Sequence, residues 1–261
     1  MFFRAPSRHG QSGQAQVESA LSLPLTLFIM LGTLQLFLML QGRIMAEYAA
    51  FRSVRAGSVK HGDCKAMTHA AVLALLPSFH SFMGGAGATP GDKLARAFGA
   101  YKDNQYRRGG AAGVTKGMPS EGNVVWIIRD SPLRATVPNP EDKDFDQADS
   151  PNRRLEIRLI YWYPLNIPFA NWVMGRMMLA RWGWKDYSAQ NPLMATEKAN
   201  WTQQSTPNLE ASIRAEVMRR ASLSPPSYTI PINASGSLRM MTPVRSTFFQ
   251  TQNCPPAPEA L

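Results

Sequence analysis

Glu18 is the side chain in this chain of 261 residues whose position most suggests chemistry. It directly precedes the run Ser19–Gly42, which contains no charged residue. A carboxylate at the edge of an apolar helix is costly unless it is paired or lies at the membrane interface. Its charge also suits the N-terminal end of a helix dipole. Glu18 can therefore be a simple interfacial residue. The glycine five positions earlier, Gly13, suggests a second interpretation, in which Glu18 has a functional role.

Other candidates for chemistry are weak. His61, Asp63, Cys64 and His69 lie close in sequence, but their spacing matches no zinc-binding pattern, so helix-cap and solvated-loop roles are favoured. The glycine-rich stretch 84–87 lacks the preceding strand and the lysine of a phosphate-binding loop. The nucleophile pattern Gly-x-Ser-x-Gly does not occur. We therefore predict no catalytic residue, no metal, no cofactor and no enzymatic activity.

Cys64 and Cys254 are the two cysteines of the chain, and both follow the apolar run. They can pair if that side of the membrane faces an oxidising compartment. A disulfide closing so long a loop would stabilise the fold by about 4–5 kcal/mol on the chain-entropy account, which is an upper guide. The alternative is two unpaired thiols.

The formal net charge of +10 comes from basic residues that are scattered singly or in pairs. No basic run interleaves with aromatic residues, and dispersed charge of this kind is typical of a solvated surface. We predict no nucleic-acid binding.

The uncharged run is long enough to span a membrane, since a spanning helix needs about 20 residues. It is too long for the apolar region of a cleavable secretory signal, and no Ala-x-Ala site closes it. We predict a retained anchor in which Pro24 is tolerated and Gly32 allows another helix to approach. Basic residues flank both ends of the run, so charge counting leaves the orientation undecided.

The rest of the chain predicts helices and a small antiparallel sheet. Expected helices are 64–76, capped by Asp63 and ended by Pro77, then 93–101 and 208–222. Expected strands are 123–129, 154–163, and a hairpin of 228–232 and 236–241 joined at 233–235. Residues 84–122 and 132–151 are otherwise read as loop. The apolar segment 167–184 contains Arg176 and Arg181, which favours packing on the sheet or resting on the membrane surface over a second span.

The stretch Gly13-Gln14-Ala15-Gln16-Val17-Glu18, followed by an apolar run containing Pro24, resembles the TadE-like family of tight-adherence pseudopilins, within the prepilin-like class. The alanine- and arginine-rich segment 46–57 and the strand ending at Tyr163-Pro164 fit the same family. The resemblance implies that a prepilin peptidase cleaves after Gly13 and that Gln14 becomes the new N-terminus. It also implies that Glu18 pairs with that new amine on a neighbouring subunit. Because the leader must reach a cytoplasmic-side protease, the resemblance sets the leader inside.

These observations predict an α+β protein with a pilin-like N-terminal transmembrane helix. We expect a leader at 1–13, a long helix at 14–60 with its membrane part at about 19–42, an exported domain at 61–254 and a flexible tail at 255–261. The residues assigned to the membrane helix are Leu21, Pro24, Phe28, Leu31, Gly32, Leu36 and Leu40.

The resemblance further implies a minor pseudopilin in the bacterial inner membrane. Its partners would be the peptidase, other pilin-like subunits, the pilus assembly machinery and membrane lipid. The alternative is a signal-anchored envelope protein whose globular domain binds a ligand, with 167–184 as its binding surface. A tethered enzyme using the His61–His69 cluster is a third, weaker alternative.

Overall fold

The protein was analysed as a computed structural model, which describes residues 12–82, 89–106, 121–137, 154–188, 207–223 and 226–259. Within these ranges, residues 12–15, 181–188 and 207–208 are described by their backbone alone. The expected leader up to residue 11, most of the glycine-rich stretch and the acidic loop at 138–153 lie outside the described residues.

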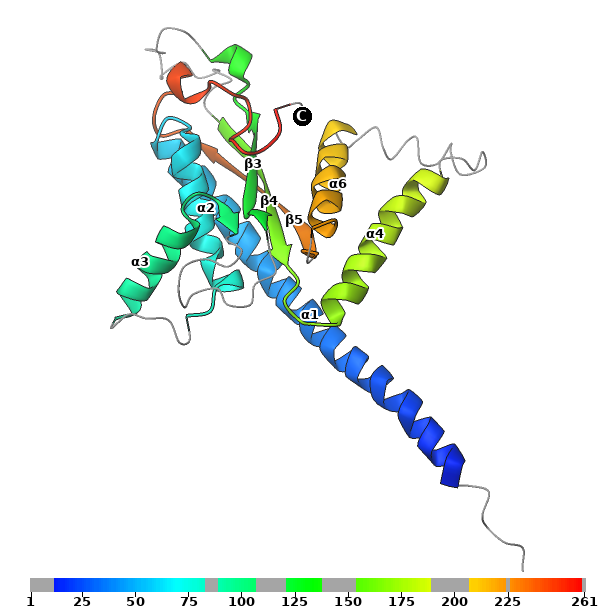
Figure 1. Ribbon diagram of the computed structural model, residues 1–261. Coiled ribbons are helices and arrows are strands. Elements are labelled where there is room, and N and C mark those ends of the chain that lie inside the picture. Colours follow the sequence, from blue (N-terminus) through cyan, green and yellow to red (C-terminus); the bar gives the residue numbers. More distant parts are fainter. Residues whose placement is uncertain are drawn as a thin grey trace, which may run out of the picture.

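One long helix, α1 (Ser12–Val59), runs from the bottom of Figure 1 into the folded domain. At 1.5 Å per residue its 48 residues extend for about 72 Å. Pro24 lies inside the helix and does not end it. Among the described residues, α1 is the helix long and apolar enough to cross a membrane, and only 6% of its most apolar stretch is buried in the protein.

A three-stranded antiparallel sheet forms the centre of the domain, with β4 between its two neighbours. Its strands are β3 (Val125–Ser131), β4 (Arg154–Pro164) and β5 (Thr229–Arg239). A separate two-stranded ladder pairs β1 (Gln105–Tyr106) with β2 (Gly122–Asn123). The long N-terminal helix and the antiparallel sheet confirm the predicted α+β class.

The predicted hairpin at 228–241 is wrong, because β5 is one continuous strand. It pairs with β4 along its whole length, from Thr229 opposite Pro164 to Arg239 opposite Arg154. The expected turn at 233–235 lies in the middle of this strand, where Ala234 is buried and Asn233 and Ser235 are exposed. A Cβ atom added to Gly236 would stand 3.1 Å from the backbone oxygen of Ala50. Glycine in a strand here marks a close approach of another backbone, which sequence patterns do not separate from a turn.

Helices cover both faces of this sheet (Figure 1). α1 and α2 (Cys64–Phe79) pack on one face, and α6 (Pro207–Ala221) packs on the other. The remaining helices are α3 (Pro90–Tyr101) and α4 (Ala170–Ser188), with short 3₁₀ turns η1 (Arg134–Thr136) and η3 (Ser246–Phe248).

The predicted end of α2 at Pro77 is also wrong, because the helix continues to Phe79. The ring of Phe79 meets Tyr101 and Tyr106 edge-on, at centroid distances of 5.1 and 5.4 Å. Aromatic pairs in such a buried cluster stabilise by about 0.5–1.5 kcal/mol each beyond their burial. These contacts hold the last turn of α2 in place despite the proline.

The C-terminal segment packs on the domain where a flexible tail was expected from residue 255. Ala257 is only 6% exposed, and the Asn253 side-chain amide donates to the carbonyl of Pro258 at 2.6 Å. The backbone N–H of Cys254 donates to the carbonyl of Ile127 in β3 at 3.0 Å. The segment therefore continues the hydrogen bonding of the sheet beyond β3.

Candidate membrane and assembly site

The proposed processing site lies in the first turn of α1. Gly13 and Gln14 are helical, because α1 begins at Ser12, two residues before the expected start at 14. The first N–H groups of a helix have no partner within it, so this turn is the part of α1 that unwinds most easily. A protease that needs an extended backbone at Gly13 would have to unwind that turn. Glu18 lies one turn further along and is exposed on the helix surface.

The apolar residues assigned to the membrane helix fall on two different faces of α1. Leu21, Leu36 and Leu40 are more than half exposed. Phe28 and Leu31 are half-buried on the face that turns toward the domain. From Phe28 onward, α1 therefore presents one apolar face to its surroundings and the opposite face to its own domain.

Gly32 and Pro24 have no packing role that the structure reveals. A Cβ atom added to Gly32 would meet nothing within 4 Å, so the glycine is not needed for any approach within this chain. Pro24 is exposed. A role for Gly32 in approach to another helix stays a prediction.

Gln35 is a buried polar residue of α1 for which no sequence pattern indicated a role. It is fully buried, although the residues around it on α1 are apolar. Its side-chain oxygen accepts a hydrogen bond from the backbone N–H of Ile167 at 3.1 Å. This bond ties the segment between β4 and α4 to the anchor. A glutamine in the middle of an apolar run was the available signal.

On the C-terminal side of Gln35, α1 packs against the sheet through small residues. Ala46, Ala49 and Ala50 have no exposed surface. A Cβ atom added to Gly42 would stand 2.7 Å from the Tyr163 ring, and one added to Gly57 would stand 2.6 Å from Leu155. The helix backbone therefore lies directly on β4 and β5. The anchor and the domain share one core.

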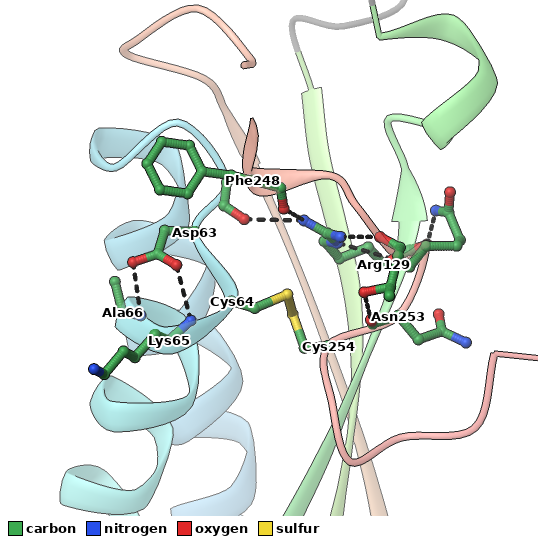
Figure 2. The surroundings of a disulfide bond; sticks show 11 residues. Asp63, Cys64, Lys65, Ala66, Arg129, Phe248, Asn253 and Cys254 are labelled. Carbon is green, nitrogen blue, oxygen red and sulfur yellow. Dashed lines mark hydrogen bonds between the residues drawn. A yellow bond between two sulfur atoms is a disulfide. The ribbon is translucent and has the colours of Figure 1, made fainter. Parts of the chain in front are cut away.

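The two cysteines are joined at the opposite end of the domain. Cys64 and Cys254 form a disulfide with their Cα atoms 5.2 Å apart (Figure 2). Cys64 is held at the start of α2 by the predicted cap, since the Asp63 carboxylate accepts from the backbone N–H groups of Lys65 and Ala66 at 3.0 and 3.2 Å. The disulfide fastens the C-terminal segment to the N-terminus of α2.

Arg129 lies beside this disulfide and is 1% exposed (Figure 2). Its guanidinium donates to the backbone oxygens of Gly62, Phe248, Thr251 and Gln252. It also stacks over the Phe249 ring, 3.8 Å from the centroid. Burial lowers the pKa of Arg129 to about 10, while the nearby charge of Asp63 opposes that shift. The side chain organises the C-terminal segment, a role that no sequence pattern indicated.

The four residues considered as a possible metal site, His61, Asp63, Cys64 and His69, make other contacts. Cys64 is in the disulfide and Asp63 caps α2. The His61 ring nitrogen Nδ1 lies 2.7 Å from the carbonyl oxygen of Pro243, and the His69 ring meets Phe98 edge-on. Within the part of the chain that the structure describes, no three His, Cys, Asp or Glu side chains are grouped to hold a metal ion.

This architecture defines a class of protein with one N-terminal membrane anchor that is continuous with an α+β domain. Residues 13–55 match the family model described as TadE-like protein, which confirms the resemblance. The match covers nearly the whole of α1, including the part that packs on the sheet, and ends before α2. No curated protein and no solved structure matches the chain. The match and the apolar helix together indicate a membrane-anchored protein related to the tight-adherence pilus.

Proposed function

We propose that the protein is a minor pseudopilin-like subunit needed for assembly of a tight-adherence pilus or a related secretion filament. The observation that carries this proposal is the family match, which begins at residue 13 and covers the apolar helix. The role is structural, and the protein is not an enzyme. Its location is the bacterial inner membrane, with the leader in the cytoplasm and the domain exported.

Processing by a prepilin peptidase between Gly13 and Gln14 is the first step of the proposed role. Its support is the glycine at the start of the family match and the position of both residues in the first turn of α1. Cleavage frees an α-amino group on Gln14 at the edge of the membrane. That amine supplies a positive charge where a neighbouring subunit can present a carboxylate.

Glu18 is the carboxylate that we assign to subunit docking. It is exposed on α1, directly before the uncharged run. In a low-dielectric environment, opposite charges attract strongly and separated charges are costly. Pairing Glu18 of one subunit with the Gln14 amine of the next would therefore fix the axial offset between neighbouring helices.

The variant Glu18→Ala tests this role, with Glu47→Ala as its matched control. Glu47 lies on the same helix beyond the apolar run and pairs with Arg43 on an exposed surface, so its removal should change little. We expect both variants to reach the membrane in normal amounts. Glu18→Ala should abolish or strongly reduce piliation by electron microscopy, whereas Glu47→Ala should not. Normal piliation of the Glu18 variant, or an equal defect in both, would reject the docking role.

A further inference from the structure

The start of α4 lies at a depth that a membrane would occupy. The Phe169 ring meets the Phe28 ring of α1 edge-on, with centroids 5.8 Å apart. Phe28 is 14 residues before Gly42, where the uncharged run ends, which is about 21 Å along the helix axis. The hydrocarbon core of a bilayer is only about 30 Å thick. If α1 spans the bilayer with its uncharged run, Phe169 cannot lie far above the membrane surface.

The segment around Phe169 has the composition of a lipid-contacting element. No charged residue occurs from Pro164 to Gly175, and none occurs from Ser227 to Ile232, where β5 pairs with the Tyr163–Pro164 end of β4 and Tyr228 lies against this segment. The first charge on α4 is Arg176, which is exposed. Two described stretches that are far apart in sequence therefore meet at this end of the sheet without a charge in either of them.

The backbone of this segment is also suited to an apolar environment. Irregular backbone is tolerated at membrane depth where its polar groups are bonded within the protein. The N–H of Leu165 donates to Tyr228, that of Ile167 donates to Gln35, and that of Ala170 donates to Pro168. Proline at 168 has no N–H group to satisfy.

Two large aromatic side chains are displayed on this segment. Phe169 is 53% exposed and Trp172 is 52% exposed. Phe169 has a φ of 68°, a left-handed conformation that costs a bulky residue about 1–2 kcal/mol. The fold thus holds an aromatic ring outward in a conformation that residues of this type avoid. Tryptophan and phenylalanine are the side chains that enter the boundary between lipid headgroups and acyl chains.

We propose that residues 165–172 form a second lipid-contacting element, in which Phe169 and Trp172 insert beside α1 into the leaflet on the domain's side of the membrane. The occupant of this surface is phospholipid, because the Phe169 ring lies against Phe28 of α1, inside the uncharged run that would span the bilayer. The membrane boundary then lies near Gln35 and not at Gly42. This inference rests on α1 as a membrane span and is independent of the pilus role.

The direction of α4 predicts an order of insertion depth for the residues along it. α4 runs up and away from α1 after its first turn (Figure 1). Insertion should therefore be deepest at Phe169, slightly shallower at Trp172 and shallowest at Met177, which is 66% exposed. Arg176 would reach the phosphate groups at the boundary, as long cationic side chains do.

The test places one fluorescent label at a time on the full-length protein in phosphatidylcholine and phosphatidylglycerol vesicles. Because the two native cysteines are joined to each other, an introduced cysteine is the one free thiol. The positions are Phe169→Cys, Trp172→Cys and Met177→Cys, each labelled with an environment-sensitive dye. Leu25→Cys serves as the control inside the span, since it is 59% exposed on α1.

Leu133→Cys serves as the control outside the membrane. Leu133 is 55% exposed and follows the end of β3 that pairs with Glu156, at the opposite end of β4 from Pro164. Lipids that carry a nitroxide on the acyl chain quench a dye that contacts them. Iodide in the buffer quenches a dye that contacts water.

We expect nitroxide lipid to quench the labels at 169 and 172 several-fold more than the label at 133, with quenching falling from 169 to 172 to 177. Labels at 169 and 172 that resemble the label at 133 would overturn the proposal. Labels shielded from both quenchers would also overturn it, because a protein surface would then cover the segment. Absence of lipid quenching at 25 as well would reject the membrane span itself, an outcome distinct from failure at 169 and 172 alone.

Discussion

Two buried arginine side chains, Arg129 and Arg220, each connect separate segments of this domain. Arg129 holds the C-terminal segment through four backbone oxygens. Arg220 has no exposed surface and lies over the Trp162 ring, 4.5 Å from its centroid. It donates to the Glu216 carboxylate and to the carbonyl of Asn123, each at 2.8 Å. Through Arg220, α6 is fixed to the outer face of the sheet and to the two-stranded ladder.

The carboxylate of Glu216 gives a pH-dependent prediction. Burial alone would raise the pKa of Glu216, but hydrogen bonds from Arg219 and Arg220 outweigh burial and lower it below its ordinary value. A depressed folded-state pKa stabilises the protein at pH above the unfolded-state value, about 4.3, and the stabilisation is lost as pH falls through the folded-state value.

The variant Glu216→Gln should therefore be destabilised at pH 7 by about 3–5 kcal/mol, since it leaves the Arg220 charge buried without its partner. The difference in unfolding free energy between wild type and variant should shrink below pH 4. Denaturant titrations of the detergent-solubilised chain at several pH values measure this difference. Arg219→Ala is the control, because Arg219 is half exposed and its loss should cost about 1 kcal/mol or less. A pH-independent difference would show that Glu216 acts through packing alone.

At the scale of elements, α1 is both the membrane anchor and a core helix of the domain. Its small residues lie on β5, and Gln35 ties it to the start of α4. The anchor therefore cannot tilt freely relative to the domain, as it could if a loop joined them.

Replacing Gln35 by leucine tests that connection. The variant Gln35→Leu leaves the buried N–H of Ile167 without an acceptor, which costs about 1–3 kcal/mol. We expect a lower thermal midpoint and faster proteolysis in the segment 165–169. Leu36→Ala is the matched control, because Leu36 neighbours Gln35 in sequence but faces outward with 55% of its surface exposed. Equal effects of the two substitutions would mean that the Gln35 hydrogen bond does not hold this segment.

The elements that could be predicted are those with a strong local signal. The uncharged run predicted α1, Asp63 predicted the start of α2, and the alternation of Leu155, Ile157 and Leu159 predicted β4. Each of these signals acts within a few residues in sequence.

What could not be predicted depends on contacts between distant residues. β5 looked like a hairpin because 233–235 has the composition of a turn, whereas in the structure these residues pair with the distant strand β4. Arg129 and Arg220 looked like surface charge because the backbone oxygens that accept from them, those of Gln252 and Asn123, lie far away in sequence. The proposed processing and docking residues came from a family resemblance, and no spacing rule within the chain would have found them.

At the scale of the whole molecule, the disulfide joins two ends of a long chain segment. Cys64→Ser should abolish the mobility shift between reduced and unreduced protein on a denaturing gel. The expected loss in unfolding free energy is below the upper guide of about 4–5 kcal/mol, because Arg129, Ala257 and the Cys254 N–H also hold the C-terminal segment. Migration that does not depend on reductant in the wild-type protein would show that the cysteines do not pair in the cell.

The whole molecule also suggests how a subunit would be positioned during assembly. α1 enters the core of the domain without an intervening loop, so a displacement of the anchor would move the domain with it. A docking charge at Glu18 would then set the height of the domain relative to its neighbours.

Cleavage between Gly13 and Gln14 by a prepilin peptidase is tested by determining the N-terminus of the mature protein. Intact-mass and N-terminal peptide mass spectrometry should be performed on protein purified from cells with and without the prepilin peptidase. The proposed processing gives a chain that begins at Gln14 when the peptidase is present and an uncleaved chain when it is absent. A chain that retains residues before Gln14 in the presence of the peptidase, or cleavage at Gly13 in its absence, would contradict it.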